Sequence, residues 1–166
     1  MLMYAQDYDE MMVRYYDNDY GWVEKVQSYA KNPQMFLCPS KSGGGWACTS
    51  PAHAPETGQA ARFGRIGYGM NIMRLPYSGG AWYGIYGHEA LAQWVAPAES
   101  IMVGDSSCPR LRAEDYINWF NQGGVSYVPH NGGANLCYMD GHAKWVNKVK
   151  QADFTYNQSR PLTTAP

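Results

Sequence analysis

A chain of 166 residues has the length of one ordinary domain, and its hydrophobic fraction of 45% is sufficient for a buried core. The formal net charge is −1 at pH 7 and no basic stripe is present, which argues against nucleic acid or an acidic membrane surface as a partner. Tyrosine, tryptophan and glycine are plentiful while charged residues make up only 16%. Such a composition is typical of an exported protein rich in strands and loops.

The N-terminal thirty residues predict two helical segments. Residues 1–12 have approximately helical spacing without an N-cap, proline or turn residue before them, which indicates the C-terminal end of a helix. The cluster Asp17-Asn18-Asp19 predicts a turn. Residues 22–30 predict a short amphipathic helix, and Asn32-Pro33 ends it.

The four cysteines show no C-x-x-C spacing, so the sequence predicts no structural zinc site and favours two disulfides in an oxidising compartment. Three pairings are possible. We expect Cys38–Cys48, which would pin a loop over residues 41–60 that is rich in Gly, Ser, Pro and Ala, and Cys108–Cys137, which would join two strands. Four unpaired, buried cysteines in a cytosolic protein are the alternative.

The middle of the chain predicts short strands separated by an irregular loop. Residues 65–73 predict a strand or turn, residues 89–95 a short helix, and residues 100–104 a strand. Between the first two lies an aromatic, glycine-rich loop over residues 75–88. Exposed aromatic side chains are candidates for contact with a partner or a sugar, although burial beneath a loop is their commoner fate. The candidate contact residues are Trp46, Trp82, Tyr83 and Tyr86.

Residues 130–146 predict a β-hairpin. Asp140-Gly141 between two apolar runs is typical of a two-residue type I′ turn. Such a turn would pair Met139 with His142, Tyr138 with Ala143, and Leu136 with Trp145. One face would then carry Ala134, Leu136, Tyr138, Ala143 and Trp145, and the other Asn135, Cys137, Met139, His142 and Lys144. We expect a single globular head over residues 1–150 and a polar tail over residues 151–166.

The hairpin also holds the candidate chemical residues. His130, Asp140 and His142 suggest a metal-dependent hydrolase, but a hairpin does not require all three to converge on one ion. We therefore interpret Asp140 as the residue that forms the type I′ turn and His142 as a cross-strand partner. His130 and Asn131 are expected to hydrogen-bond the backbone at the strand entry. Ser106 and Ser107 lack a nucleophile elbow. The sequence accordingly predicts no catalytic residue.

Several segments occur in an order that resembles one protein family. They are LMYAQDYDE, a helix with Trp22, Tyr29 and Asn32, FLCPS, YGMN, APAESIMVGDSS and HNGGANLCYMDGHAKWV. From Leu2 to about Val146 the series resembles bacterial pseudopilin-like proteins with a prepilin-type N-terminal cleavage and methylation segment. Their processing-associated H-X9-DG motif matches His130, nine intervening residues and Asp140-Gly141.

The resemblance implies an α+β fold with a pilin-like head, in which the end of an N-terminal helix packs on a small antiparallel sheet. The implied function is a structural subunit of a type IV pilus-like or type II secretion pseudopilus filament, extracytoplasmic and bacterial. Its partners would be copies of itself or other pilins, and the inner-membrane assembly machinery. That machinery would be reached through a hydrophobic helix upstream of LMYAQDYDE. The helix was trimmed from this chain, lies before a mis-set start, or was lost by the protein.

The family implies no required cofactor. Some pseudopilin heads bind calcium, which makes Asp105 and Asp140 candidate Ca²⁺ ligands here. The alternative function is a soluble secreted module that binds a glycan or a protein.

Overall fold

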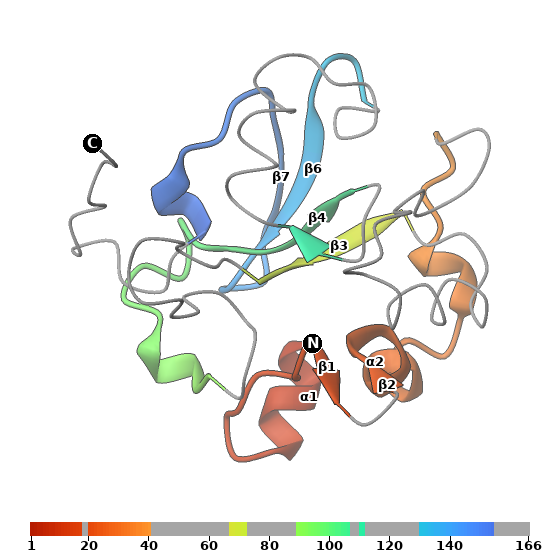
Figure 1. Ribbon diagram of the computed structural model, residues 1–166, viewed down its shortest axis with the longest axis vertical. Helices are drawn as coiled ribbons and strands as arrows, with labels where there is room; N and C mark the ends of the chain where they lie inside the picture. Colours follow the sequence, from red (N-terminus) through yellow and green to blue (C-terminus); the bar gives the residue numbers. More distant parts are fainter. Residues whose placement is uncertain (18–19, 41–66, 73–88, 107–109, 112–129, 155–166) are drawn as a thin grey trace.

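The computed structural model describes residues 1–17, 20–40, 67–72, 89–106, 110–111 and 130–154. Within these ranges the chain has an α+β fold, as expected, with a five-stranded sheet and two short α-helices. Figure 1 shows both helices on the same side of the sheet. The core lies between the sheet and these helices, because Val23 and Val26 of one helix and Met70 and Met102 of the sheet belong to one buried cluster.

The sheet has the strand order β5-β3-β4-β6-β7. Strands β3 (Tyr68–Asn71), β4 (Ile101–Asp105), β6 (Ala134–Tyr138) and β7 (Ala143–Val146) pair antiparallel, and β5 (Arg110–Leu111) runs parallel to β3. The central position of β4 places the middle and the end of the chain side by side. Within residues 65–73, where the sequence predicts a strand or a turn, the described residues form strand β3, and the strand predicted over residues 100–104 is confirmed.

Helix α2 follows the prediction, and the first helix is shorter than predicted. Helix α1 (Leu2–Asp7) ends before the predicted residues 8–12, because Asp9 and Glu10 have positive φ, whereas α2 (Trp22–Ala30) spans the predicted residues. The Glu24 carboxylate accepts the Gly21 N–H at 2.7 Å and so caps the start of α2. A small antiparallel pair, β1 (Tyr16–Asp17) and β2 (Tyr20–Gly21), precedes it. The short 3₁₀ helices are η1 (Pro33–Phe36), η3 (Leu91–Gln93) and η4 (Gln151–Phe154).

The β6–β7 hairpin is present, but its predicted register is wrong by one residue. Cys137 pairs with Ala143, and Tyr138 donates its N–H to the His142 carbonyl at 2.9 Å. The turn therefore has three residues, and the Gly141 N–H closes it on the Tyr138 carbonyl at 2.9 Å. Only Gly141 in this turn has a positive φ, of 94°, whereas a type I′ turn would also require one at Asp140.

The change of register alters the faces of β7. Trp145 lies opposite Asn135 rather than Leu136, and Leu136 instead faces Lys144. Trp145 is consequently 47% exposed, while Leu136 remains buried. The expected apolar face is thus formed by β6 alone.

Both predicted disulfide pairings are wrong. Cys38 and Cys137 are free thiols, and each pairing, Cys38–Cys48 and Cys108–Cys137, requires one of them. Cys38 is instead buried with its sulfur 3.5 Å from the His130 ring, and Cys137 lines an apolar pocket. Cys48, Cys108 and the loop over residues 41–60 lie outside the described residues.

The predicted tail begins inside the packed structure. Phe154 of η4 is fully buried, and the Asn71 side-chain amide donates to the carbonyls of Phe154 at 2.9 Å and Ile101 at 2.8 Å. Asn71 thereby joins β3, β4 and η4. The packed part of the chain reaches at least to Phe154, and residues 155–166 lie outside the described residues.

Candidate functional site

Three side chains able to bind a metal meet at one end of the sheet. Cys38 follows η1, Asp105 ends β4, and His130 stands before β6. His130 Nε2 lies 3.5 Å from Cys38 Sγ and 3.3 Å from Asp105 Oδ2. One potential ligand atom from each residue lies within 4.8 Å of the other two. We refer to these residues as the Cys38–Asp105–His130 cluster.

Gly67 allows the Cys38 segment to approach the sheet. A Cβ atom at Gly67 would lie 2.4 Å from Cys38 Cβ and 2.7 Å from the Cys38 backbone nitrogen, so only glycine fits there without a shift. The Gly67 N–H donates to the Phe36 carbonyl at 2.8 Å, and the Ser106 N–H donates to the Gly67 carbonyl at 2.9 Å. These bonds fix Cys38 beside the end of β4.

A tight turn positions His130. Its backbone N–H and carbonyl both bond to Gly133 at 3.1 Å, and the central residues Asn131 and Gly132 have positive φ, as a type I′ turn requires. The Trp145 indole N–H donates to the His130 carbonyl at 2.8 Å. At the strand entry these bonds are made by the backbone groups of His130, whereas its ring nitrogen Nε2 lies near Cys38 and Asp105.

The Asp105 carboxylate is fully buried. Its Oδ2 atom accepts the N–H of Asn135 at 2.6 Å, and this bond joins β4 to the start of β6. The pKa of the neighbouring Tyr68 hydroxyl is raised, first by burial and then by the negative charge of Asp105. The cluster is therefore a sparsely solvated place in which a negative charge lies next to an imidazole.

The geometry differs from that of a nucleophilic Cys–His–Asp triad. In such a triad the thiol and the carboxylate use the two different ring nitrogens of the histidine. Here Cys38 Sγ and Asp105 Oδ2 both approach His130 Nε2. Because both groups approach Nε2, neither of them orients the ring through Nδ1 as the carboxylate of a triad does. The cluster therefore suits the binding of a shared cation better than activation of the thiol.

The remaining motif residues form a separate group at the other end of β6. Asp140 Oδ1 accepts the His142 backbone N–H at 3.1 Å and lies 2.6 Å from His142 Nδ1. The His142 ring stacks on Tyr138, with centroids 4.3 Å apart. His142 is thus a cross-strand partner as predicted, but of Tyr138 rather than Met139.

The structure does not bring the predicted metal ligands together. His130 and Asp105 lie at the start of β6, whereas Asp140 and His142 lie beyond its end. The five residues of β6 correspond to a separation of roughly 16 Å at the usual rise of a strand. Asp105 and Asp140 therefore do not form a joint calcium site, nor do His130, Asp140 and His142 form a hydrolase centre.

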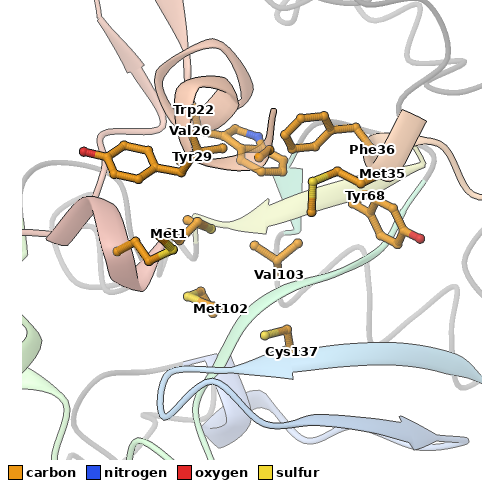
Figure 2. Close-up of a pocket in the computed structure, with 12 residues that line it drawn as sticks. Met1, Trp22, Val26, Tyr29, Met35, Phe36, Tyr68, Met102, Val103 and Cys137 are labelled. Carbon is orange, nitrogen blue, oxygen red and sulfur yellow. The ribbon is translucent and has the colours of Figure 1, made fainter. Parts of the chain in front are cut away.

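A second feature is an apolar groove between the helices and the sheet. Figure 2 shows Met1, at the N-terminal end of α1, among the side chains of this groove. Its volume is about 330 Å³. The residues that line it are Met1, Met3, Trp22, Val26, Tyr29, Ala30, Met35, Phe36, Tyr68, Met102, Val103 and Cys137. Burial raises the pKa of the Cys137 thiol.

The sequence alone pointed to Asp105 and His130 separately, and it did not indicate that Cys38 belongs to the same site. Cys38 and His130 are 92 residues apart, whereas sequence motifs for metal sites have short, local spacings. The tandem Asn131-Gly132 was the signal for the turn that positions His130. The predicted contact residues Trp46, Trp82, Tyr83 and Tyr86 lie outside the described residues.

Comparisons with protein-family models, with curated proteins and with solved structures found no match for this chain. Among the described residues, no helix has the length and apolar character needed to cross a membrane.

Proposed function

We propose that this chain is the globular head of a pilin-like or pseudopilin-like filament subunit, extracytoplasmic and without catalytic activity. The observation that carries the proposal is the apolar groove at the N-terminal end of α1. The order of the sequence motifs and the α+β fold support it.

We expect a helix that continues N-terminally from α1 to pack on this groove. Trp22 and Phe36 form one wall, and Met102 and Val103 of β4 form the other, as Figure 2 shows. Met1 lies between the walls. A hydrophobic helix leading into α1 would bury its apolar side chains against both walls, and burial of apolar surface favours that packing.

Exposed apolar side chains near α1 support contact with other subunits. Met3 of α1, at the edge of the groove, is 60% exposed, and Tyr8, which follows α1, is 51% exposed. Exposed apolar patches are typical of contact surfaces, and repeated head-to-tail contacts between identical subunits build helical filaments. The proposed partners are copies of this chain or related pilins.

The decisive measurement is the intact mass and N-terminal sequence of the protein from its native cell surface. We expect a chain longer than the present one, beginning with a methylated residue and a hydrophobic helix. A mature protein that starts at Met1 would contradict the proposal. It would favour the alternative, a secreted binding module, whose groove would take an apolar segment of another protein.

A groove variant tests the same idea by assembly. Met35 lines the groove yet is 56% exposed, so Met35→Glu should leave the head folded while placing a charge where the helix packs. Val95→Glu is the matched control, because Val95 is 69% exposed and does not line the groove. We expect less filament sheared from cells with Met35→Glu and an unchanged amount with Val95→Glu. Equal amounts would contradict the proposed role of the groove.

A further inference from the structure

We propose that the Cys38–Asp105–His130 cluster is a zinc-binding site. The proposal is independent of the filament function, since it rests on the cluster alone. It also departs from the expectation that the lack of C-x-x-C spacing excludes such a site, because the three residues come from distant parts of the chain.

The two separations that involve His130 Nε2 match a tetrahedral zinc ion, and the third, between Cys38 and Asp105, is within 4.8 Å. Zinc binds thiolate sulfur at about 2.3 Å, imidazole nitrogen at about 2.0–2.1 Å and carboxylate oxygen at about 2.0–2.2 Å. Tetrahedral angles then separate sulfur from nitrogen by about 3.6 Å and nitrogen from oxygen by about 3.4 Å. The observed separations are 3.5 Å between Cys38 Sγ and His130 Nε2, and 3.3 Å between His130 Nε2 and Asp105 Oδ2.

The donor set selects the kind of metal. Calcium and magnesium take oxygen ligands, whereas zinc accepts sulfur, nitrogen and oxygen together. A cysteine, a histidine and an aspartate within one 4.8 Å cluster therefore favour zinc over the calcium that the family resemblance implies. Three protein ligands leave a fourth position for water or another donor.

Neighbouring backbone groups orient the ligands, as the groups around the ligands of a metal site do. The Asn135 N–H donates to the Asp105 oxygen that faces His130, and hydrogen bonds of this kind orient a ligating carboxylate. The turn closed by Gly133 fixes the His130 backbone. Cys38 is 6% exposed and Asp105 is fully buried, whereas the His130 side chain is 23% exposed, so an ion would neutralise largely buried charge while water could reach it from the side of His130.

The alternative is a cluster held by hydrogen bonds alone. A proton on His130 Nε2 would then be donated to Asp105, with Cys38 as a weak second acceptor. This alternative predicts the same contacts but no metal, so direct measurement of bound zinc separates the two.

The experiment measures zinc bound to the purified full chain after dialysis against zinc and removal of the excess. The test variants are Cys38→Ser, His130→Gln and Asp105→Asn. The last retains an oxygen that can accept the Asn135 N–H. Cys137→Ser and His142→Gln are matched controls, since they replace a cysteine and a histidine that lie outside the cluster.

We expect one zinc ion per chain in the wild type and in both controls, and loss of the ion in the test variants. Cobalt substitution should give a thiolate-to-cobalt charge-transfer band that Cys38→Ser loses and Cys137→Ser keeps. Zinc should also raise the melting temperature of the wild type and not that of Cys38→Ser. Wild-type protein that is folded but binds no zinc overturns the proposal, as does undiminished binding by the test variants.

A measurement on the wild type alone keeps the test decisive if the variants unfold. Nitrogen NMR of the histidine rings should show zinc-dependent coordination at His130 Nε2 and no change at His142. Zinc-dependent changes at another histidine and not at His130 would overturn the proposal.

Discussion

At the tip of the β6–β7 hairpin, the Asp140 carboxylate is held by its own neighbour. The His142 backbone N–H lowers the pKa of Asp140 most, and the His142 side chain lowers it further. Since the folded pKa lies below the unfolded value, the stability from this carboxylate is present above the unfolded pKa. It is lost as the pH falls through the folded pKa.

A carbon NMR titration of the Asp140 carboxyl group tests this interaction. We expect a pKa below the usual aspartate value in the wild type. In His142→Ala it should rise only part of the way, because the backbone N–H at 3.1 Å remains while the ring contact is lost. A wild-type pKa in the ordinary aspartate range would contradict the assignment. A pKa in His142→Ala that rises fully to the ordinary value would contradict it as well.

The cluster shows the limit of sequence reasoning for single residues. His130 and Asp105 attracted notice because of a motif and a strand end, but nothing in their neighbourhoods pointed to Cys38. Its approach depends on Gly67, which lets the chain after η1 cross the start of β3 in close contact. Contacts between segments so distant in the chain follow from tertiary packing, and no local periodicity encodes them.

Among the elements, helix α2 was predictable and the register of the hairpin was not. An apolar stripe of period 3.6 and the stop at Asn32-Pro33 determine α2 locally. Asp140-Gly141 is compatible with either a two-residue or a three-residue turn, and the two differ in whether Asp140 has a positive φ. Pairing with β4 fixes β6 in the sheet, but β7 is an edge strand whose faces are mostly exposed.

Substitution of Gly141 tests the turn. Gly141 has a φ of 94°, and an added Cβ would lie 3.0 Å from Leu2 Cδ1. We expect Gly141→Ala to lower the free energy of unfolding by about 1–2 kcal/mol, because a side chain is strained in the left-handed region. Gly141→Asn should lower the free energy of unfolding by a smaller amount, since asparagine tolerates the left-handed region. Urea unfolding measures both.

Asp140→Gly distinguishes the two turn lengths. In a type I′ turn glycine at this position would relieve strain and stabilise the hairpin. In the three-residue turn it removes the hydrogen bonds to His142 and increases the freedom of the unfolded chain, so we expect destabilisation. A gain in stability would instead support the two-residue turn that the sequence predicts.

At the scale of the whole molecule, the fold is closed by contacts between the middle and the end of the chain. β4 lies between β3 and β6, and η4 packs where Asn71 bonds the carbonyls of Ile101 and Phe154. The sequence after residue 150 is mostly polar, which predicts a tail, yet its one phenylalanine, Phe154, belongs to the core. Average polarity predicts a tail, whereas a single buried aromatic side chain is enough to anchor a segment.

Phe154 is therefore expected to contribute to global stability despite its place near the C-terminus. It is fully buried, and Phe154→Ala would remove apolar contacts and leave a cavity, which typically costs about 3–5 kcal/mol. Val95→Ala, at a position 69% exposed, is the control and should change the free energy of unfolding by less than about 0.5 kcal/mol. Guanidinium unfolding followed by tryptophan fluorescence measures both. A loss in Phe154→Ala no larger than that in the control would mean that η4 is not part of the cooperative fold, and the head would then end with the sheet.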